Sequence, residues 1–495
     1  MISLSPPEPT DWFTSGFWRL RRSKFLAGSQ YALDRIRPHD GGVLPGETST
    51  LGERLGVSGL PVPVYTGKDP SGPLAPHRVL AMKALTGVEV KDLDPSWPDP
   101  AAARAALHKL FPGILSPPRF ADPADPKTLV RLATEGIAAH RLRRNGSSGF
   151  VIDLTWLRRF PVRHGLVPYG ARLLLSEDLA SVAVEIDGCA HRPGDPGFAA
   201  ARARFEASLL AAVTAMDHLL VVHLLCAGGL ILALRAGTPP GHPLRAALAP
   251  FTFNSARMNS AALDVLAREG AYLHRLFGFT WPGLSALFAE GLATLDLRPV
   301  PERLARAGLA DRLSDLPFWE EALGWWRPLA RYAHRLTDEL VEPSVAASML
   351  ASLEKVTGRL ESAHDSPKAA LAERLSILLF EVTVGHRQVG NAAPYVQDPA
   401  WMPVKLRPGD PERDRCRKQD LVQKTVLSFL SSRQRAPRFA DPIAPRLATA
   451  AARTAWLSLD RDLGAWEEGL SARNARRRHP YEEITRAKVS TSAAV

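Results

Sequence analysis

The segment that decides the fold is DHLLVVHLLCAGG, residues 217–229. It lies inside a longer apolar run, LLAAVTAMDHLLVVHLLCAGGLILAL, so that His218 and His223 are surrounded by leucine and valine. A helix that is apolar on every side is either a membrane span or the centre of a large protein. Because ionisable groups are costly at the middle of a bilayer, the sequence favours a buried central helix.

The spacing of these two histidines constrains the helix that carries them. On a regular α-helix, five residues turn through about 500°, and the two rings would diverge by about 140°. A wider, π-type turn brings both rings to one side, and such turns occur mostly at functional sites. The alternative is two unrelated core histidines. We therefore expect either a π-type turn with a shared ligand or an ordinary helix without one.

A third histidine, His386, follows another apolar helical run in LLFEVTVGHRQVGNAAPY, and Asn391 comes shortly after it. Three imidazoles and an amide from two helices would suit a transition metal such as iron or manganese. The sequence contains no HExxH, GxSxG, P-loop or GxGxxG motif, which leaves the histidines as the main chemical signal.

Composition predicts a mainly α protein. The chain has 495 residues, of which 45% are hydrophobic, and alanine, leucine, arginine and proline are abundant. Residues 1–11 read as a loose tail, and strands of a small β region are expected near residues 150–188. From about residue 197 the pattern is almost entirely helical. No linker is long enough to separate independent domains, so residues 1–495 are predicted to be a single domain.

The net charge of +11 raises the question of an anionic partner. The basic residues alternate with acids and alanines, which is typical of solvated helix faces, and no nucleic-acid-binding motif is present. We therefore expect no nucleic-acid partner and at most peripheral membrane contact. Cys189, Cys226 and Cys416 form no CxxC motif and no signal peptide is evident, which favours a reducing, cytoplasmic location.

These motifs together resemble the lipoxygenase family. The family carries two ligand histidines separated by four residues on a long apolar helix, followed by a His-Pro pair, here His242-Pro243. Pro250 and Asn259 also fall in register. The chain ends HPYEEITRAKVSTSAAV, which is similar to the family's ending in an aliphatic residue whose terminal carboxylate binds the metal. The resemblance extends from about residue 12 to residue 495.

The resemblance implies a metal held by His218, His223, His386, an amide and the carboxylate of Val495. The family's amide ligand stands four residues after the third histidine, where this chain has Gly390. Either a one-residue insertion moves Asn391 into place, or the site lacks this ligand. Iron is the implied metal, with manganese possible.

The implied fold is a lipoxygenase-like catalytic domain, a helical bundle around the long metal-binding helix, without the N-terminal lipid-binding β-sandwich of animal and plant members. The implied activity is that of a non-haem dioxygenase. A metal-bound hydroxide would abstract hydrogen from the 1,4-diene of a polyunsaturated fatty acid or similar lipid, and O2 addition would give a hydroperoxide. No protein residue is assigned as acid or base.

Two alternatives stay open. One is an oxygenase of specialised metabolism with the same fold and metal but a non-fatty-acid substrate, such as another polyene. The other is a metal-free, lipoxygenase-like binding protein.

Several neighbouring residues receive expected roles from the same resemblance. Asp217, Glu381 and Gln388 are candidates for orienting the imidazoles, with exposed polar groups as the alternative. Cys226 is expected to be a small core residue rather than a ligand, and His242 to be structural.

The substrate and O2 pocket is expected at Ser260 and Leu263. Ser260 stands where the family has alanine or glycine, and Leu263 stands where many members have an arginine. A partner for a substrate carboxylate would then be Arg245, Arg257 or Arg268, or the substrate is not a free acid.

Overall fold

A computed structural model describes residues 2–4, 33–72, 88–90, 94–111, 115–120, 122, 125–180, 182–358, 364–432 and 436–494. Of the predicted tail, residues 1–11, only β1 (Ile2–Leu4) is described, and it pairs in parallel with β4 (Val88–Val90) rather than being loose. Val495, the predicted carboxylate ligand, lies outside the described residues.

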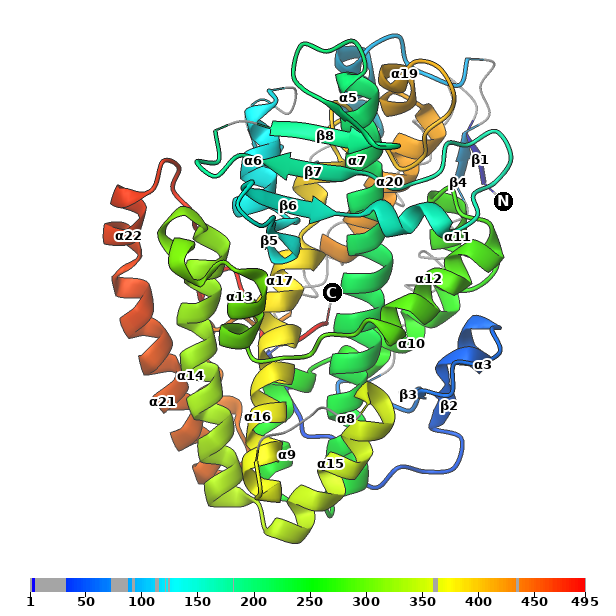
Figure 1. The fold of residues 1–495 in the computed structure, drawn as a ribbon. Coiled ribbons are helices and arrows are strands. Elements are labelled where there is room, and N and C mark those ends of the chain that lie inside the picture. The colour runs from blue at the N-terminus through cyan, green and yellow to red at the C-terminus, as the bar shows by residue number, and fades with distance from the viewer. Residues whose placement is uncertain are drawn as a thin grey trace.

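The axis of the fold is one continuous helix, Phe198–Gly237. It consists of α7 (Phe198–Ala211), the π-helix η4 (Ala212–Ala227) and α8 (Gly228–Gly237). Within the described part of the chain, it is the one helix long and apolar enough to cross a membrane, but 89% of its most apolar window is buried by other elements. This confirms the central buried helix, and Figure 1 shows it running through the middle of the molecule.

A second long rod lies beside the axis. It is built from α16 (Pro367–Phe380), the short π-helix η6 (Glu381–Gly385) and α17 (His386–Gly390). η6 and α17 both contact η4, so the two π-helical segments face each other across the core. Of the two alternatives that the histidine spacing left open, η4 therefore supports the π-type turn, and η6 is a second such segment that the sequence did not reveal.

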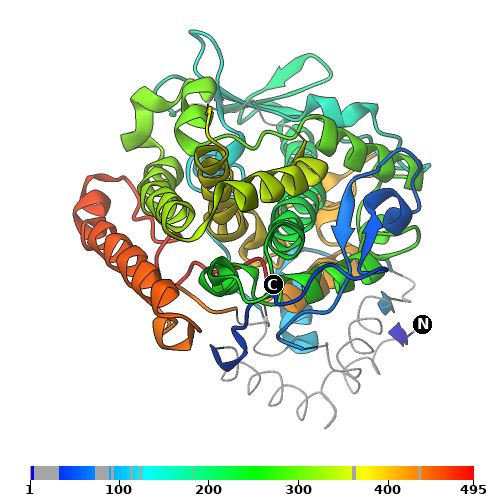
Figure 2. The ribbon, with the colours of Figure 1, turned by 90° about the horizontal axis from the view of Figure 1, so that it is seen from below.

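Further helices cover these two rods in layers. α14 (Pro317–Leu340) packs on α16, and α15 (Pro343–Thr357) packs on α8. α21 (Ala450–Glu468) lies outside α14, at the edge of the molecule in Figures 1 and 2. The other α-helices are α3 (Leu51–Leu55), α5 (Pro100–Leu110), α6 (Lys127–Thr134), α9 (Pro243–Thr252), α10 (Ser255–Val265), α11 (Tyr272–Leu276), α12 (Trp281–Ala293), α13 (Val300–Ala307), α18 (Ala393–Val396), α19 (Pro411–Arg415), α20 (Lys418–Ser432) and α22 (Leu470–Arg476).

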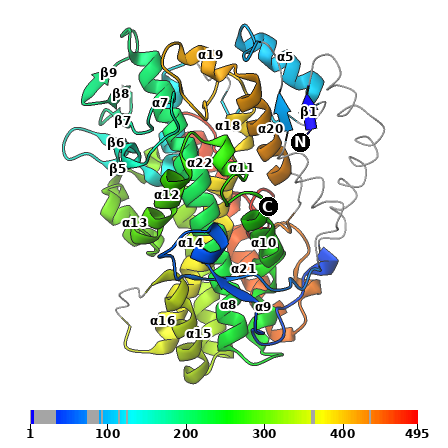
Figure 3. The same cartoon turned by 90° about the vertical axis from the view of Figure 1, so that its right-hand side faces the viewer.

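The predicted β region is an antiparallel sheet in the order β5-β6-β7-β8-β9. It sits over α7 at one end of the central helix, as Figures 1 and 3 show. Alternate residues such as Leu173 and Leu175 are buried, as expected for a sheet with one face on the core. Its strands are β5 (Arg143–Arg144), β6 (Phe150–Asp153), β7 (Arg172–Leu175), β8 (Val182–Ile186) and β9 (Cys189–His191), and a separate hairpin pairs β2 (Thr48–Thr50) with β3 (Pro63–Tyr65).

Short 3-10 helices make several of the connections: η1 (Leu33–Arg35), η2 (Ala139–Arg141), η3 (Thr155–Arg159), η5 (Ala310–Asp315) and η7 (Ala444–Arg446). Proline occupies an early position in many of the α-helices, where its fixed φ and missing N–H cost little. At α9, His242 caps the helix before Pro243, and its Nδ1 accepts from the Leu244 amide at 3.2 Å. His242 is thus structural, as expected.

Candidate metal centre

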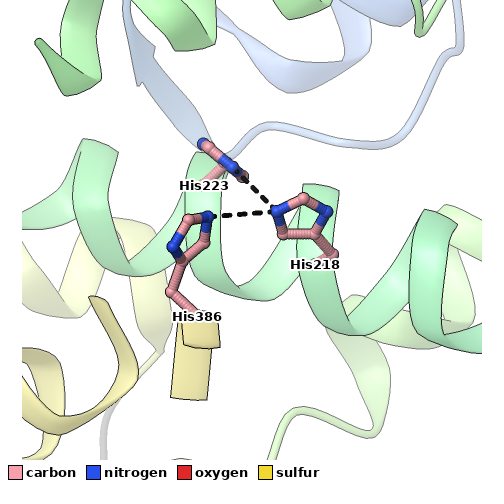
Figure 4. A group of neighbouring side chains, drawn as sticks. All are labelled: His218, His223 and His386. Carbon is pink, nitrogen blue, oxygen red and sulfur yellow. Dashed lines mark hydrogen bonds between the residues drawn. The ribbon is translucent and has the colours of Figure 1, made fainter. Parts of the chain in front are cut away.

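Three imidazoles converge where the two π-helical segments meet. His218 and His223 project from η4 and His386 begins α17 directly after η6, as Figure 4 shows. The ring centroids of His218 and His223 are 4.8 Å apart, and each lies 5.1 Å from that of His386. The wider turn of η4 is what lets residues five apart share one side of the helix.

The nitrogen positions fit a single metal ion. His218 Nε2 lies 3.1 Å from His386 Nε2 and 3.1 Å from His223 Nε2. A neutral imidazole carries one N–H, so His218 Nε2 cannot satisfy both neighbours as a donor. Two nitrogens bound at right angles to one metal, at bond lengths of about 2.1 Å, lie about 3 Å apart. The distance from His218 Nε2 to each of the other two nitrogens thus matches a pair of adjacent ligands on one metal ion.

The surroundings keep this cluster in its ligating form. His223 and His386 are buried, and the flanking Leu219, Leu220 and Val222 are buried too. Burial lowers the pKa of His218 well below its ordinary value, and the neighbouring His223 and His386 lower it further. A neutral imidazole offers its lone pair to a metal, whereas a protonated one does not.

Asn259 of α10 holds one of the three imidazoles in place. Its Oδ1 lies 3.2 Å from His223 Nδ1, and its Nδ2 donates to the His223 carbonyl at 2.6 Å. Because the side-chain amide nitrogen of Asn259 donates to the backbone carbonyl of His223, the amide oxygen faces the imidazole ring. The proton of the ring is therefore on Nδ1, where it can be donated to that oxygen. The Nε2 lone pair of His223 therefore points into the cluster. The register after the His-Pro pair included Asn259, but nothing in the sequence assigned it this role.

We predict that Asn259→Ala lowers metal affinity by about ten- to a hundredfold, because the His223 ring loses the contact that fixes its orientation. Competition with a calibrated chelator measures this. Asn259→Asp keeps an acceptor for Nδ1–H and should bind metal more tightly than the alanine variant. Equal metal affinity in wild type and Asn259→Ala would show that Asn259 only packs.

Comparison with known proteins identifies this architecture. No model of a known protein family matches the sequence, and no curated protein matches it either. Among solved structures, a calcium-dependent 11R-lipoxygenase matches with a TM-score of 0.73 at 14% identity, covering 98% of this chain and 82% of that one. A coral 8R-lipoxygenase matches with a TM-score of 0.71 at 12% identity, covering 97% and 82%. A LOX structure in complex with arachidonate matches with a TM-score of 0.72 at 13% identity over the same shares.

The fold is lipoxygenase-like. This confirms the resemblance and the mainly helical fold class that the sequence predicted. Because the sequence identities are only 12% and 14%, the similarity establishes the fold and not the activity. Within the lipoxygenase-like fold, the described residues His218, His223 and His386 form a group whose ligand atoms all lie within 4.8 Å of one another. Such a group could hold a metal ion.

The predicted amide ligand is not in this group. Asn391 caps the end of α17, and its Nδ2 donates to Glu483 Oε2 at 3.4 Å. The residue that faces the imidazoles is Gly390, whose added Cβ would lie 3.0 Å from His218 Nε2. One residue on a helix turns the side chain by about 100°, which is why Asn391 points elsewhere. Of the two readings left open by the sequence, the structure supports a site without this amide.

The chain up to Ala494 is held close to α9 and α10. The Thr491 hydroxyl donates to the Pro250 carbonyl at 2.9 Å, and the Ser492 hydroxyl donates to the Phe253 carbonyl at 3.0 Å. Asn254 Nδ2 donates to the Ala494 carbonyl at 3.4 Å, and Ala494 is 1% exposed. The C-terminal segment is therefore buried in the fold up to its last described residue, beside the connection between α9 and α10.

Three polar residues that were expected to orient the imidazoles make their hydrogen bonds and ion pairs with other groups. Asp217 turns away from the cluster and pairs with Arg141 at 2.6 Å and His140 at 2.8 Å. Glu381 pairs with Arg303, and the Gln388 amide donates to the Gly136 carbonyl. Each of the three is therefore engaged with another part of the core.

Asp217 instead stabilises the fold. Burial alone would raise the pKa of its carboxyl, but Arg141 and His140 outweigh burial and hold the pKa at about 2. We predict that Asp217→Asn lowers the free energy of unfolding by about 2 kcal/mol at neutral pH, with metal content unchanged. The difference from wild type should persist down to about pH 4 and shrink as the pH falls toward 2, where Asp217 itself takes up a proton. Urea unfolding across this range measures it; lost metal at unchanged stability would reinstate the orienting role.

Cys226, close to the ligands on η4, is buried, and burial raises the pKa of its thiol well above the ordinary value. A thiol held in its neutral form packs as a small apolar residue and is a poor ligand. This agrees with the expected core role.

The substrate pocket predicted at Ser260 and Leu263 stays a prediction, and the structure shows a cavity elsewhere. Ser260 is partly buried and Leu263 is 1% exposed, both in α10. A cavity of about 390 Å3 lies between the ligand helices and α12, α13 and α14, but neither residue lines it. None of the three histidines lines it either. Its walls include Met216, Asp217, Val221, Arg303, Phe380 and Gln388.

Of the candidate carboxylate partners, Arg245 is excluded by its contacts. Its guanidinium is buried and donates to the carbonyls of His39, Gly41, Arg235 and Thr238 and to the Thr238 hydroxyl. Arg257 is partly buried and donates to the Gly72 carbonyl at 3.3 Å, whereas Arg268 is exposed.

Proposed function

We propose that this protein is a metal-dependent dioxygenase that adds O2 to a 1,4-diene of a polyunsaturated fatty acid or similar lipid, giving a hydroperoxide. The observation that carries the proposal is the convergence of three imidazole Nε2 atoms at the core of a lipoxygenase-like fold. Without that cluster, the fold alone would support only a relationship to lipoxygenases.

His218, His223 and His386 would hold the metal, and we propose iron, with manganese as the alternative. When bound, such a metal supplies the one-electron redox chemistry that neither a diene nor O2 can undertake alone at a useful rate. The chain positions it: Asn259 holds the His223 ring, and the apolar walls of η4 keep water away from the reacting groups.

The composition of the cluster fits this reaction better than a hydrolytic one. Within the described residues, the group contains three imidazoles and no carboxylate or thiolate. Asp217, the acid next to His218 in sequence, is committed to Arg141 and His140 and kept ionised. No side chain is therefore poised as a general base for activating water. Radical oxygenation of a diene needs none.

The substrate is proposed to be an apolar polyene. The neighbouring LOX structure in complex with arachidonate shows that this fold accepts a polyunsaturated fatty acid in that protein. A specific observation also supports the second candidate, a polyene that is not a free acid. Leu263 is buried and apolar, and the guanidinium of Arg245 already donates to backbone carbonyls. Neither position therefore provides a positive charge that could bind a substrate carboxylate.

The test begins with the metal content of the full chain ending in its native Val495, measured by elemental analysis. About one iron or manganese per chain is expected. Oxygen uptake and conjugated-diene absorbance are then followed with linoleate and, in parallel, with its methyl ester and other neutral polyenes. Turnover of linoleate supports the first candidate, and turnover of neutral polyenes alone supports the second. Absence of metal after reconstitution with both ions would overturn the proposal and leave a lipoxygenase-like binding protein.

A further inference from the structure

The cavity of about 390 Å3 between the ligand helices and α12, α13 and α14 has an apolar wall and a polar rim. Arg143, Thr294 and Asp296 line it and are exposed, so its rim lies between β5 and the segment that follows α12. An apolar pocket of this size with a few polar groups is typical of a small-molecule site. The wall consists of buried side chains: Met216, Val222, Leu297, Phe318, Trp319 and Phe380.

The carboxylates that line the cavity are all paired with arginines. The pairs are Asp217 with Arg141, Glu381 with Arg303, Glu290 with Arg159 and Asp296 with Arg298. A carboxylate next to a guanidinium repels an approaching anion less than a free carboxylate does. An anion that enters the cavity therefore meets ion pairs and not unopposed negative charge.

Arg143, at the rim, makes no ion pair within the part of the chain that the structure describes. Its Nη1 donates to the carbonyls of His140 and Leu142 at 2.9 and 2.8 Å, which hold the guanidinium in place without neutralising its charge. Burial lowers the pKa of Arg143, and repulsion by the neighbouring Arg141 adds to this effect. A fixed and partly desolvated cation gains more from a bound anion than a fully hydrated one does.

Arg303 adds an unused donor to the same cavity. Its Nη2 donates to Glu381 Oε1 at 2.5 Å, and its guanidinium carbon lies 5.3 Å from the centre of the Phe380 ring. Its Nε is buried and has no hydrogen-bond partner among the described residues. A buried N–H without an acceptor costs free energy, which a bound oxygen acceptor would recover. The cavity thus joins positive, hydrogen-bonding groups to an aromatic wall.

We infer that this cavity is a binding site for an amphipathic monoanion, with its carboxylate at Arg143 and its apolar body against Phe318 and Phe380. A monoanion matches the single lining arginine that lacks an acid partner, whereas a phosphate dianion would bring a second charge that no free cation opposes. None of the three clustered histidines lines the cavity, so its occupant is a molecule other than the one oxygenated at the metal. The inference therefore does not depend on the proposed function.

The probe is sodium decanoate, a saturated acid without the diene that the proposed reaction needs, added to the full chain and followed by isothermal titration calorimetry. Saturable binding of one molecule per chain is expected, with decan-1-ol and decyl phosphate at least about tenfold weaker. In Arg143→Gln, decanoate affinity should fall at least about tenfold while decan-1-ol affinity stays within about twofold, which shows that the apolar wall persists. Removing metal with a chelator should leave decanoate affinity unchanged.

The matched control is Arg144→Gln, at the next position of β5. Arg144 does not line the cavity and pairs with Glu177 and Asp311 at 2.9 and 3.0 Å, so its loss should leave decanoate affinity within about twofold of wild type.

Four results would overturn the inference. They are no binding of decanoate to the wild type, equal decanoate affinity in wild type and Arg143→Gln, tighter binding of decyl phosphate than of decanoate, and loss of decanoate binding when metal is removed. The last would place the carboxylate at the histidine cluster. A chain that holds no metal but binds decanoate through Arg143 would refute the proposed function and leave this site standing.

Discussion

Replacing His386 with alanine is expected to lower metal affinity at least about a hundredfold, more than the loss of a residue that only orients a ligand. His386 is the one imidazole of the cluster supplied by the second rod, and its Nε2 lies 3.1 Å from that of His218. Without it, only two of the three imidazoles remain, and both come from one helix. His218→Ala and His223→Ala should behave in the same way.

Elemental analysis and chelator competition measure the loss, and far-UV circular dichroism checks that the helical fold persists. The matched control is His242→Ala, which removes an imidazole that caps α9 and has no place in the cluster. It should lose about 1 kcal/mol of stability and keep its metal. One tightly bound metal per chain in His386→Ala would remove this residue from the site.

Extending the chain beyond Val495 by two glycines is expected to lower metal affinity by a similar factor, at least about a hundredfold. The residues just before Val495 are buried: Thr491, Ser492 and Ala493 are 0% exposed and Ala494 is 1% exposed. Added peptide groups would have to be buried without partners or would pull the segment out of the core. Either result also displaces the terminal carboxylate that the family resemblance makes a ligand.

The control for this experiment is Val495→Ile, which keeps an apolar residue and a free carboxylate at the same place and should retain metal. Thermal unfolding of the metal-free forms distinguishes loss of packing from loss of a ligand. If the extended chain unfolds earlier yet binds metal as tightly as wild type, Val495 is not a ligand and the segment acts only through packing. The predicted carboxylate ligation is then wrong.

Much of the fold was accessible from local pattern. Residues 209–234 are apolar on every side of the helix, which predicts that other elements surround the helix at the centre of the protein. A helix with one side facing water would carry polar residues on that side. The five-residue spacing of His218 and His223 predicts a π-type turn, and η4 confirms it. The clustering of strand-forming residues near 150–188 predicts the small sheet. These features depend on neighbours in sequence, which is why sequence alone reveals them.

The orientation of polar side chains around the cluster was not accessible in the same way. Asp217 stands next to His218 in sequence but pairs with Arg141, whereas Asn259 comes from a different helix and holds His223. Sequence proximity is a poor guide on a helix, because each step rotates the side chain by about 100°.

The sequence by itself pointed to the three clustered histidines and the buried helix that carries two of them, since apolar periodicity and residue spacing encode these features directly, and its motifs carried the resemblance to lipoxygenases. Only the tertiary structure decided what completes the site. It set Asn259 behind His223, tied Asn391 to Glu483 and left Gly390 facing the imidazoles. These three contacts depend on how α10, α17 and the C-terminal segment pack in the fold. They join residues far apart in the chain, so they are fixed by tertiary packing and not by the local order of residues.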